Sequence, residues 1–222
     1  MLFPLGSACK VREAIQRFLI KNSLETQMFD WVVSNFKTIL YFIKNIDIPL
    51  TEDDFIDTNN QPHGHRIVHH KKVRFESIHD CNYQNSYEYE LPLFLEKYNR
   101  RLNRLKSYIV NNEKIDFIHL LDMSMNDKNT NLQLYIPSVV EISEFFEAIQ
   151  KINPFLHCNL HILVPPQHCM VYQTFFNYDV NQLELLKINP NIFIHFLSQD
   201  ENREPHREQC QHWSWHEVFE KI

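Results

Sequence analysis

Glycine is nearly absent from this chain of 222 residues, which contains only Gly6 and Gly64. Phosphate-binding loops of the Walker and dinucleotide-binding types need several glycines, because the backbone must approach the phosphate closely. The sequence therefore excludes both types of nucleotide site. The net charge of −6 also argues against a dedicated nucleic-acid binder, which usually carries a basic surface.

Long apolar runs are missing as well. No stretch approaches the roughly 18 residues needed to cross a bilayer. The opening residues 1–6 lack the charged and apolar regions of a signal peptide. The five cysteines are an odd number and widely spaced, which is typical of free thiols in a reducing compartment. We therefore expect a cytoplasmic protein without a membrane span.

The metal-binding patterns are incomplete. Histidines and cysteines gather in three groups, but none contains the Cys-x-x-Cys spacing that would make a zinc site convincing. Histidines four residues apart occur without the Glu of a metallopeptidase helix, or in a segment predicted to be a loop. We therefore expect no metal ion and no cofactor. The groups are His63, His65, His69 and His70; Cys158, His161, His168 and Cys169; and His206, Cys210, His212 and His216.

Helical and strand periodicities alternate along most of the chain. Among the predicted helices, 138–149 has the clearest start, with Ser138 as the N-cap and Glu141 completing a capping box. The segment 47–62 is predicted to be a loop. The other predicted helices cover 7–21, a segment from residue 25 or 30 to 44, 91–110, 182–187 and 213–222; the predicted strands cover 73–78, 115–121, 160–164 and 192–197.

This alternation predicts an α/β fold in a single domain, residues 1–222. The sheet is expected to be mainly parallel, with about four to five strands flanked by helices. A helical N-terminal third, residues 1–45, is expected to carry Cys9 and to lead into an α/β body over residues 73–222.

Polar residues follow four of the predicted strands. In an open α/β sheet, ligand sites lie beyond the carboxyl ends of the strands, so these residues are candidates for a ligand site, and the His and Asp residues among them are what a catalytic pocket would need. The alternative is that loops are polar whatever their function. In chain order, the residues are His79 and Asp80, then Asp122, then Gln167 and His168, then Ser198 and Asp200.

Cys9 differs from the other candidates because it lies in the first turn of a predicted helix. Unpaired amides and the helix dipole favour an anion there, which lowers the pKa of a thiol and increases the reactive thiolate form. A histidine such as His79 can then act as the base, with a carboxylate orienting its ring. The alternative is a buried, inert cysteine.

The opening Leu5-Gly6-Ser7-Ala8-Cys9-Lys10-Val11-Arg12-Glu13-Ala14, followed by Met28-Phe29-Asp30-Trp31, resembles that of an uncharacterised family described as papain-like cysteine peptidases. Further similarities are Ile78-His79-Asp80, the helix with Arg100, Arg101 and Arg104, and the Trp213/Trp215 ending. The resemblance therefore extends over most of the chain. Met28 stands where a proline commonly precedes Phe-Asp-Trp in that family.

The resemblance implies that Cys9 is the nucleophile and His79 the base, with Asp80 or Asp122 as the acidic partner. Asp30 has two interpretations, as the cap of the second helix or as an acceptor in the Cys9 pocket. A papain-like core pairs its strands antiparallel, whereas the periodicity predicts a parallel sheet. Residues expected to line the site are Gly6, Ser7, Asp30, Trp31 and Trp213.

The first hypothesis is a thiol-dependent hydrolase or acyl transferase acting on a peptide, protein or sugar-containing substrate. First-turn amides near Cys9 would stabilise the oxyanion. The second is a non-enzymatic binding module in which the thiol is packed and unreactive. The third is a carbohydrate-active transferase that uses strand-end carboxylates and needs Asp122 rather than Cys9.

Overall fold

The structure is a computed structural model. It describes residues 2–6, 11, 14, 26–30, 32–58, 65–82, 84–121, 131–169, 174–199 and 214–222. No helix within these ranges combines the length and the apolarity needed to cross a membrane.

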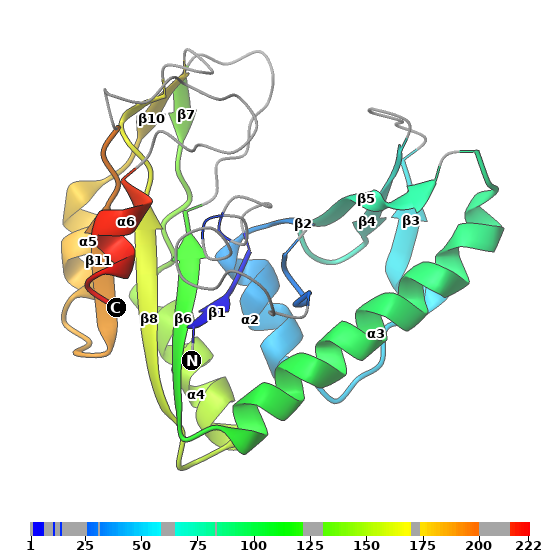
Figure 1. Ribbon diagram of the computed structural model, residues 1–222, viewed down its shortest axis with the longest axis horizontal. Coiled ribbons are helices and arrows are strands. Elements are labelled where there is room, and N and C mark those ends of the chain that lie inside the picture. Colours follow the sequence, from blue (N-terminus) through cyan, green and yellow to red (C-terminus); the bar gives the residue numbers. More distant parts are fainter. Residues whose placement is uncertain are drawn as a thin grey trace.

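Two four-stranded sheets dominate the described part of the molecule (Figure 1). One sheet is entirely parallel, and the other is entirely antiparallel. The parallel sheet has the order β1 (Leu2–Pro4), β6 (Lys114–Leu120), β8 (His157–Val164), β11 (Ile192–Phe196). The antiparallel sheet has the order β2 (Val32–Ser34), β5 (Phe75–Asn82), β4 (His65–His70), β3 (Phe55–Asp57).

A smaller three-stranded sheet and the helices complete the described fold. The small sheet consists of β7 (Asn131–Gln133), β10 (Thr174–Asn177) and β9 (His168–Cys169). The helices are α2 (Phe36–Lys44), α3 (Tyr87–Asn111), α4 (Val139–Ile152), α5 (Val180–Leu186) and α6 (Trp215–Phe219), with a 3-10 turn at Glu52–Asp54. The long α3 runs between the antiparallel sheet and the region of α4 and the parallel sheet (Figure 1).

The predicted fold class, one mainly parallel sheet behind a helical N-terminal third, is wrong. The antiparallel sheet is a second body of strands, and residues 1–45 contribute β1 and β2 before α2 begins. The helix predicted from residue 25 or 30 starts only at Phe36, because Asn35 caps it by accepting a hydrogen bond from the Thr38 N–H at 3.1 Å. The β-branched Val32 and Val33 instead pair with β5.

The composition of the antiparallel sheet explains why two of its strands were not predicted from the sequence. β3 lies inside the segment predicted as a loop, and β4 carries histidines that were also expected in a loop. Hydrophobic periodicity does not detect β4, since four of its six residues are polar in the sequence His-Arg-Ile-Val-His-His. Pairing with β3 and β5 on both sides satisfies its backbone instead.

The core between the parallel sheet and the helices α2 and α4 is largely aromatic. The Phe117 ring of β6 lies edge-on to Phe3 of β1, 5.8 Å between centroids, and to Phe145 of α4, 5.4 Å away. Phe36 of α2 lies 5.5 Å from Phe145. Burying a side chain of this size stabilises the fold by about 2 to 3 kcal/mol. These contacts fix α2 and α4 on one face of the sheet.

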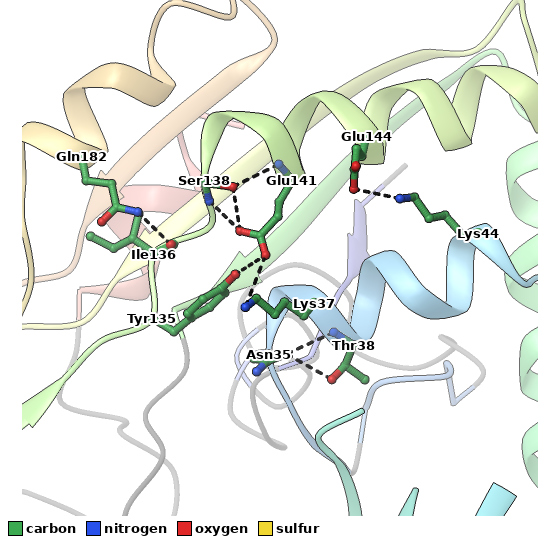
Figure 2. A network of polar contacts seen from close by, with 10 residues as sticks. All are labelled: Asn35, Lys37, Thr38, Lys44, Tyr135, Ile136, Ser138, Glu141, Glu144 and Gln182. Atoms are coloured by element: carbon green, nitrogen blue, oxygen red, sulfur yellow. Dashed lines mark hydrogen bonds and ion pairs between the residues drawn. The ribbon is translucent and has the colours of Figure 1, made fainter. Parts of the chain in front are cut away.

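A polar network fixes the start of α4 and connects it to α2 (Figure 2). The Ser138 hydroxyl accepts from the Glu141 N–H at 3.2 Å, and the Glu141 carboxylate accepts from the Ser138 N–H at 2.8 Å, so the predicted capping box is confirmed. The Tyr135 hydroxyl also donates to Glu141, and the Lys37 ammonium lies 4.0 Å from the same carboxylate. These contacts lower the pKa of Glu141 against the opposing effect of its burial.

Removing the cap provides a test of this network. We expect Ser138→Ala to lower the free energy of unfolding by about 1 kcal/mol, since a helix N–H and the Glu141 carboxylate both lose a partner. Val140→Ala, at a position of the same helix whose side chain is 66% exposed, is the matched control and should change stability by less than about 0.5 kcal/mol. Urea unfolding measures both, and equal losses would contradict a specific role for the cap.

Candidate active site

The first part of the site is the turn that leaves β1. The Leu5 N–H donates to the Ile118 carbonyl at 2.8 Å, so the chain continues alongside β6 beyond the end of β1. Gly6 then adopts φ +87°, in the left-handed region that favours glycine. A Cβ added to Gly6 would lie 2.3 Å from the Ser34 Oγ and 3.2 Å from the Phe29 Cβ. Both the φ angle and the close packing therefore require glycine before the segment that carries Cys9.

The second part is the tight turn that precedes β2. The Asp30 carboxylate accepts a hydrogen bond from the Gln27 N–H at 2.6 Å. Asp30 is 1% exposed, and the Phe29 side chain beside it is completely buried. The interpretation of Asp30 as the cap of the second helix is wrong, because Asn35 has that role. Asp30 instead stabilises the turn against which Gly6 packs.

The third part is strand β5, which carries His79. Ser77 of β5 pairs with Val32 of β2, so the backbone of His79 lies two residues beyond this pair, at the end of β2 that is nearest to Asp30. The side chain of His79 lies outside the described residues. The structure thus places the Gly6 turn, the Asp30 turn and the His79 backbone in neighbouring elements, although they are far apart in sequence.

Asp80 follows His79 and is held by groups from β5 and α3. Its carboxylate accepts from the Ser77 hydroxyl at 2.7 Å, from Lys97 at 2.9 Å and from the Tyr98 hydroxyl, and Arg101 lies 3.8 Å away. Burial raises the pKa of Asp80, but these donors outweigh it, and the net shift is downward. Asp80 therefore connects α3 to the antiparallel sheet.

His119 is a group of this region that the sequence analysis did not single out. It lies near the carboxyl end of β6, has no exposed surface and meets the Phe36 ring edge-on at 5.4 Å. Neither ring nitrogen makes a hydrogen bond of good geometry with a described residue, although the nearby Leu5 backbone partly opposes the lowering of the His119 pKa. The buried Ser34 Oγ also lacks a partner among the described residues. Unpaired buried polar groups are costly and rare. The sequence feature that could have identified His119 is a histidine within the apolar run Ile115–Leu121.

Of the residues predicted for the Cys9 site, five lie outside the described residues: Ser7, Cys9, Trp31, Asp122 and Trp213. Among the other strand-end candidates, Asp200 and the side chain of His168 also lie outside them.

The described cysteine thiols differ from the reactive thiol expected at Cys9. Cys81 and Cys158 are free and buried, and burial raises the pKa of each to about 12. Both are therefore protonated, unreactive thiols at neutral pH. Within the part of the chain that the structure describes, no three His, Cys, Asp or Glu side chains are grouped to hold a metal ion.

Gly6→Ala tests the turn. We expect a loss of roughly 2 kcal/mol in the free energy of unfolding, because the new methyl group must displace Ser34 and the backbone must keep a strained φ. Adding Ser34→Ala removes the hydroxyl from the contact and should restore part of this loss, but not the part due to φ. Thermal or urea unfolding of the two variants and of Ser34→Ala alone measures the effect. A Gly6→Ala variant as stable as the wild type would contradict the assigned geometry.

His119 makes stability depend on pH. Burial lowers its pKa to about 4, whereas an unfolded histidine titrates near pH 6.5. The unfolded chain therefore binds the proton more tightly, and the stabilisation present above pH ~6.5 is lost as the pH falls towards 4. A shift of this size corresponds to roughly 3 kcal/mol.

We expect His119→Leu to reduce the fall in unfolding free energy between pH 6.5 and 4, measured by urea unfolding at several pH values. His157→Leu, at an exposed position of β8, is the control and should keep the wild-type pH dependence. Parallel pH profiles for His119→Leu and the wild type would show that His119 does not cause the fall.

Comparison with known proteins gave no match: no protein-family model, curated protein or solved structure matches this chain. The geometry of the described residues is therefore the structural observation that bears on function.

Proposed function

We propose that the protein is a thiol-dependent hydrolase or acyl transferase with Cys9 as the nucleophile and His79 as the base. The observation that carries this proposal is the packing of Gly6 against Phe29 and Ser34. This contact links the segment that leads to Cys9 with β2, and β2 pairs directly with the strand that carries His79. Two predicted catalytic elements are thereby joined through one described contact.

The position of the turn in the fold supports the proposal. Gly6 follows the carboxyl end of β1 in a parallel sheet, which is where α/β proteins place their ligand sites. Cys9 follows Gly6 by three residues, and a chain of this length spans at most about 11 Å. A substrate at Cys9 would therefore lie close to the turns formed by Gly6 and Asp30.

The proposed reaction needs only a thiol, a histidine and backbone amide groups. The Cys9 thiolate would attack the carbonyl carbon of an ester, thioester or amide, forming a C–S bond and an oxyanion. Amide N–H groups of the predicted first helical turn would stabilise the oxyanion. His79 would hold the thiol proton and return it to the leaving group as the old bond breaks. Water or another acceptor then releases the acyl group from sulfur, which distinguishes a hydrolase from a transferase.

The resemblance to papain-like cysteine peptidases supports the same roles for Cys9 and His79. The resemblance supports these roles but not a papain-like fold, because the parallel sheet that bears the Gly6 turn differs from an antiparallel papain-like core. The acidic partner of His79 is proposed to be Asp80 or Asp122. Asp80 already has four partners at the β5–α3 interface, and Asp122 lies outside the described residues, so both alternatives stay open.

The test is the rate of iodoacetamide labelling of the folded protein from pH 5 to 9, with mass spectrometry locating each modified cysteine. We expect Cys9 to react first, with an apparent pKa well below ~8.5 that rises in His79→Ala. Cys81 and Cys158 serve as internal controls, because their burial should delay labelling until the protein unfolds. His157→Ala is the control for loss of a histidine and should leave the Cys9 profile unchanged.

If Cys9 is labelled only on unfolding, like Cys81 and Cys158, a nucleophilic role for it is excluded. A reactive Cys9 whose pH profile is the same in His79→Ala would retain the thiol as nucleophile and remove His79 as its base.

A further inference from the structure

A second group of polar side chains lies on the opposite face of the parallel sheet. Phe117 and His119 of β6 point towards α2 and α4, so Asp116 and Ile118 point to the other face. In the register of the sheet, Asp116 is beside Asn159 and Ile118 is beside His161. Figure 1 shows β6, β8 and β11 side by side. His195 of β11 therefore completes a row of polar groups across three adjacent strands.

The row forms a continuous path from the interior outwards. The Asp116 Oδ1 accepts from the Asn159 amide at 2.7 Å and lies 3.5 Å from the His161 Nε2. The His161 Nδ1 is 3.0 Å from the His195 Nε2. Asp116 is 7% exposed and His161 4% exposed, whereas His195 is only half-buried. His195 is the most exposed of the three residues, so solvent reaches the path at His195.

The charge of Asp116 favours one direction along this path. An ionised carboxylate can only accept, so a proton on the His161 Nε2, which faces Asp116, is favoured over a bare nitrogen there. At 3.5 Å the carboxylate orients the imidazole mainly through its charge. The His161 Nδ1 is then bare and must accept from His195, which places the proton of His195 on Nε2. The second nitrogen of His195, Nδ1, is left without a proton.

We propose that Asp116, His161 and His195 form a second ligand-binding site, in which the Nδ1 of His195 accepts a hydrogen bond from a hydroxyl-bearing ligand. The ligand hydroxyl keeps its proton, and His195 stays neutral. The negative charge of Asp116 orients His161, and His161 in turn orients His195. His161 and Asp116 act through His195 and are positioning residues. The proposal does not depend on Cys9.

The surroundings keep His195 in the form that this role needs. Burial lowers the pKa of His195 to about 4, and His161 and Lys221 act in the same direction. Burial also lowers the pKa of His161, with Lys114 acting in the same direction and Asp116 opposing the shift. His195 is therefore neutral, with a free lone pair, at neutral pH. The described charged or titratable groups that act on the pair are Asp116 and Lys114 of β6, and Lys221 near the C-terminus.

The ring of Phe193 supplies an apolar surface beside His195. Its ring stacks on His161, with 4.9 Å between centroids and 15° between planes, and the residue is 41% exposed. Phe193 and His195 are two residues apart on β11, so their side chains share one face of the sheet. A ligand lying against the exposed part of Phe193 would have its hydroxyl group within reach of His195.

The decisive experiment is a nitrogen-15 NMR measurement on the wild-type protein with labelled histidines. We expect a coupling across the hydrogen bond between the His195 Nε2 and the His161 Nδ1, with the proton on His195. We also expect the His161 proton on Nε2. A proton on the Nδ1 of either histidine, or the absence of the coupling at pH 7, would overturn the proposal. Because this measurement needs no variant, a failure to fold cannot obscure the result.

Carbethoxylation by diethyl pyrocarbonate then measures the reactivity of the bare nitrogen. The reagent transfers its ethoxycarbonyl group to an unprotonated imidazole nitrogen and releases ethanol and carbon dioxide. At pH 7 we expect His195 to react faster than the exposed His157, and Asp116→Asn to slow His195 by roughly tenfold. Glu147→Gln, at an exposed site on α4, is the matched control and should leave the rate unchanged. A His195 slower than His157, or unaffected by Asp116→Asn, would contradict a bare His195 Nδ1 held in place through Asp116.

Discussion

Burial of strand β6 on both faces is the constraint on which the described structure depends. Every residue of β6 after Lys114 is buried, and the strand lies between β1 and β8 in the parallel sheet. One face packs on α4 through Phe117 and on α2 through His119, and the other carries Asp116. β1 is only three residues long, so its position, and that of the Gly6 turn, depends on pairing with β6.

The two buried titratable residues of this strand, Asp116 and His119, are exceptions to its apolar interior, and their surroundings differ. Asp116 has an amide donor from the neighbouring strand and an ammonium group 3.7 Å away. Among the described residues, His119 has only the Leu5 backbone near its ring as a polar neighbour that affects its pKa, and it remains neutral at neutral pH because it is buried. A charged group in such a place must be paired, whereas a histidine can avoid the cost by losing its proton. The neutral His119 borders the Gly6 turn, and Asp116 orients two further histidines.

The sequence predicted best where periodicity is long and burial is uniform. The strand expected at 115–121 is found at Lys114–Leu120, and the helix expected at 138–149 is Val139–Ile152 with the expected cap. Hydrophobic periodicity did not reveal the short elements. β2, for example, has three residues, which are too few to show a period. For the candidate site, the local sequence drew attention to Gly6, but its left-handed φ and its packing against Ser34 are visible only in the structure. It misread Asp30 as a helix cap, since a carboxylate before a helical pattern resembles a cap whether or not the helix begins there.

What the sequence determined by itself is local: the central strand, the capping box of α4 and the lack of any glycine-rich phosphate loop. These features depend on neighbours a few residues apart, which the order of residues records directly. Only the tertiary structure placed Gly6 against Ser34, paired the polar strand β4 with its neighbours, and aligned His161 with His195, 34 residues away. Such contacts depend on strand register, and strand register is decided by how both faces of a sheet are buried rather than by the local sequence.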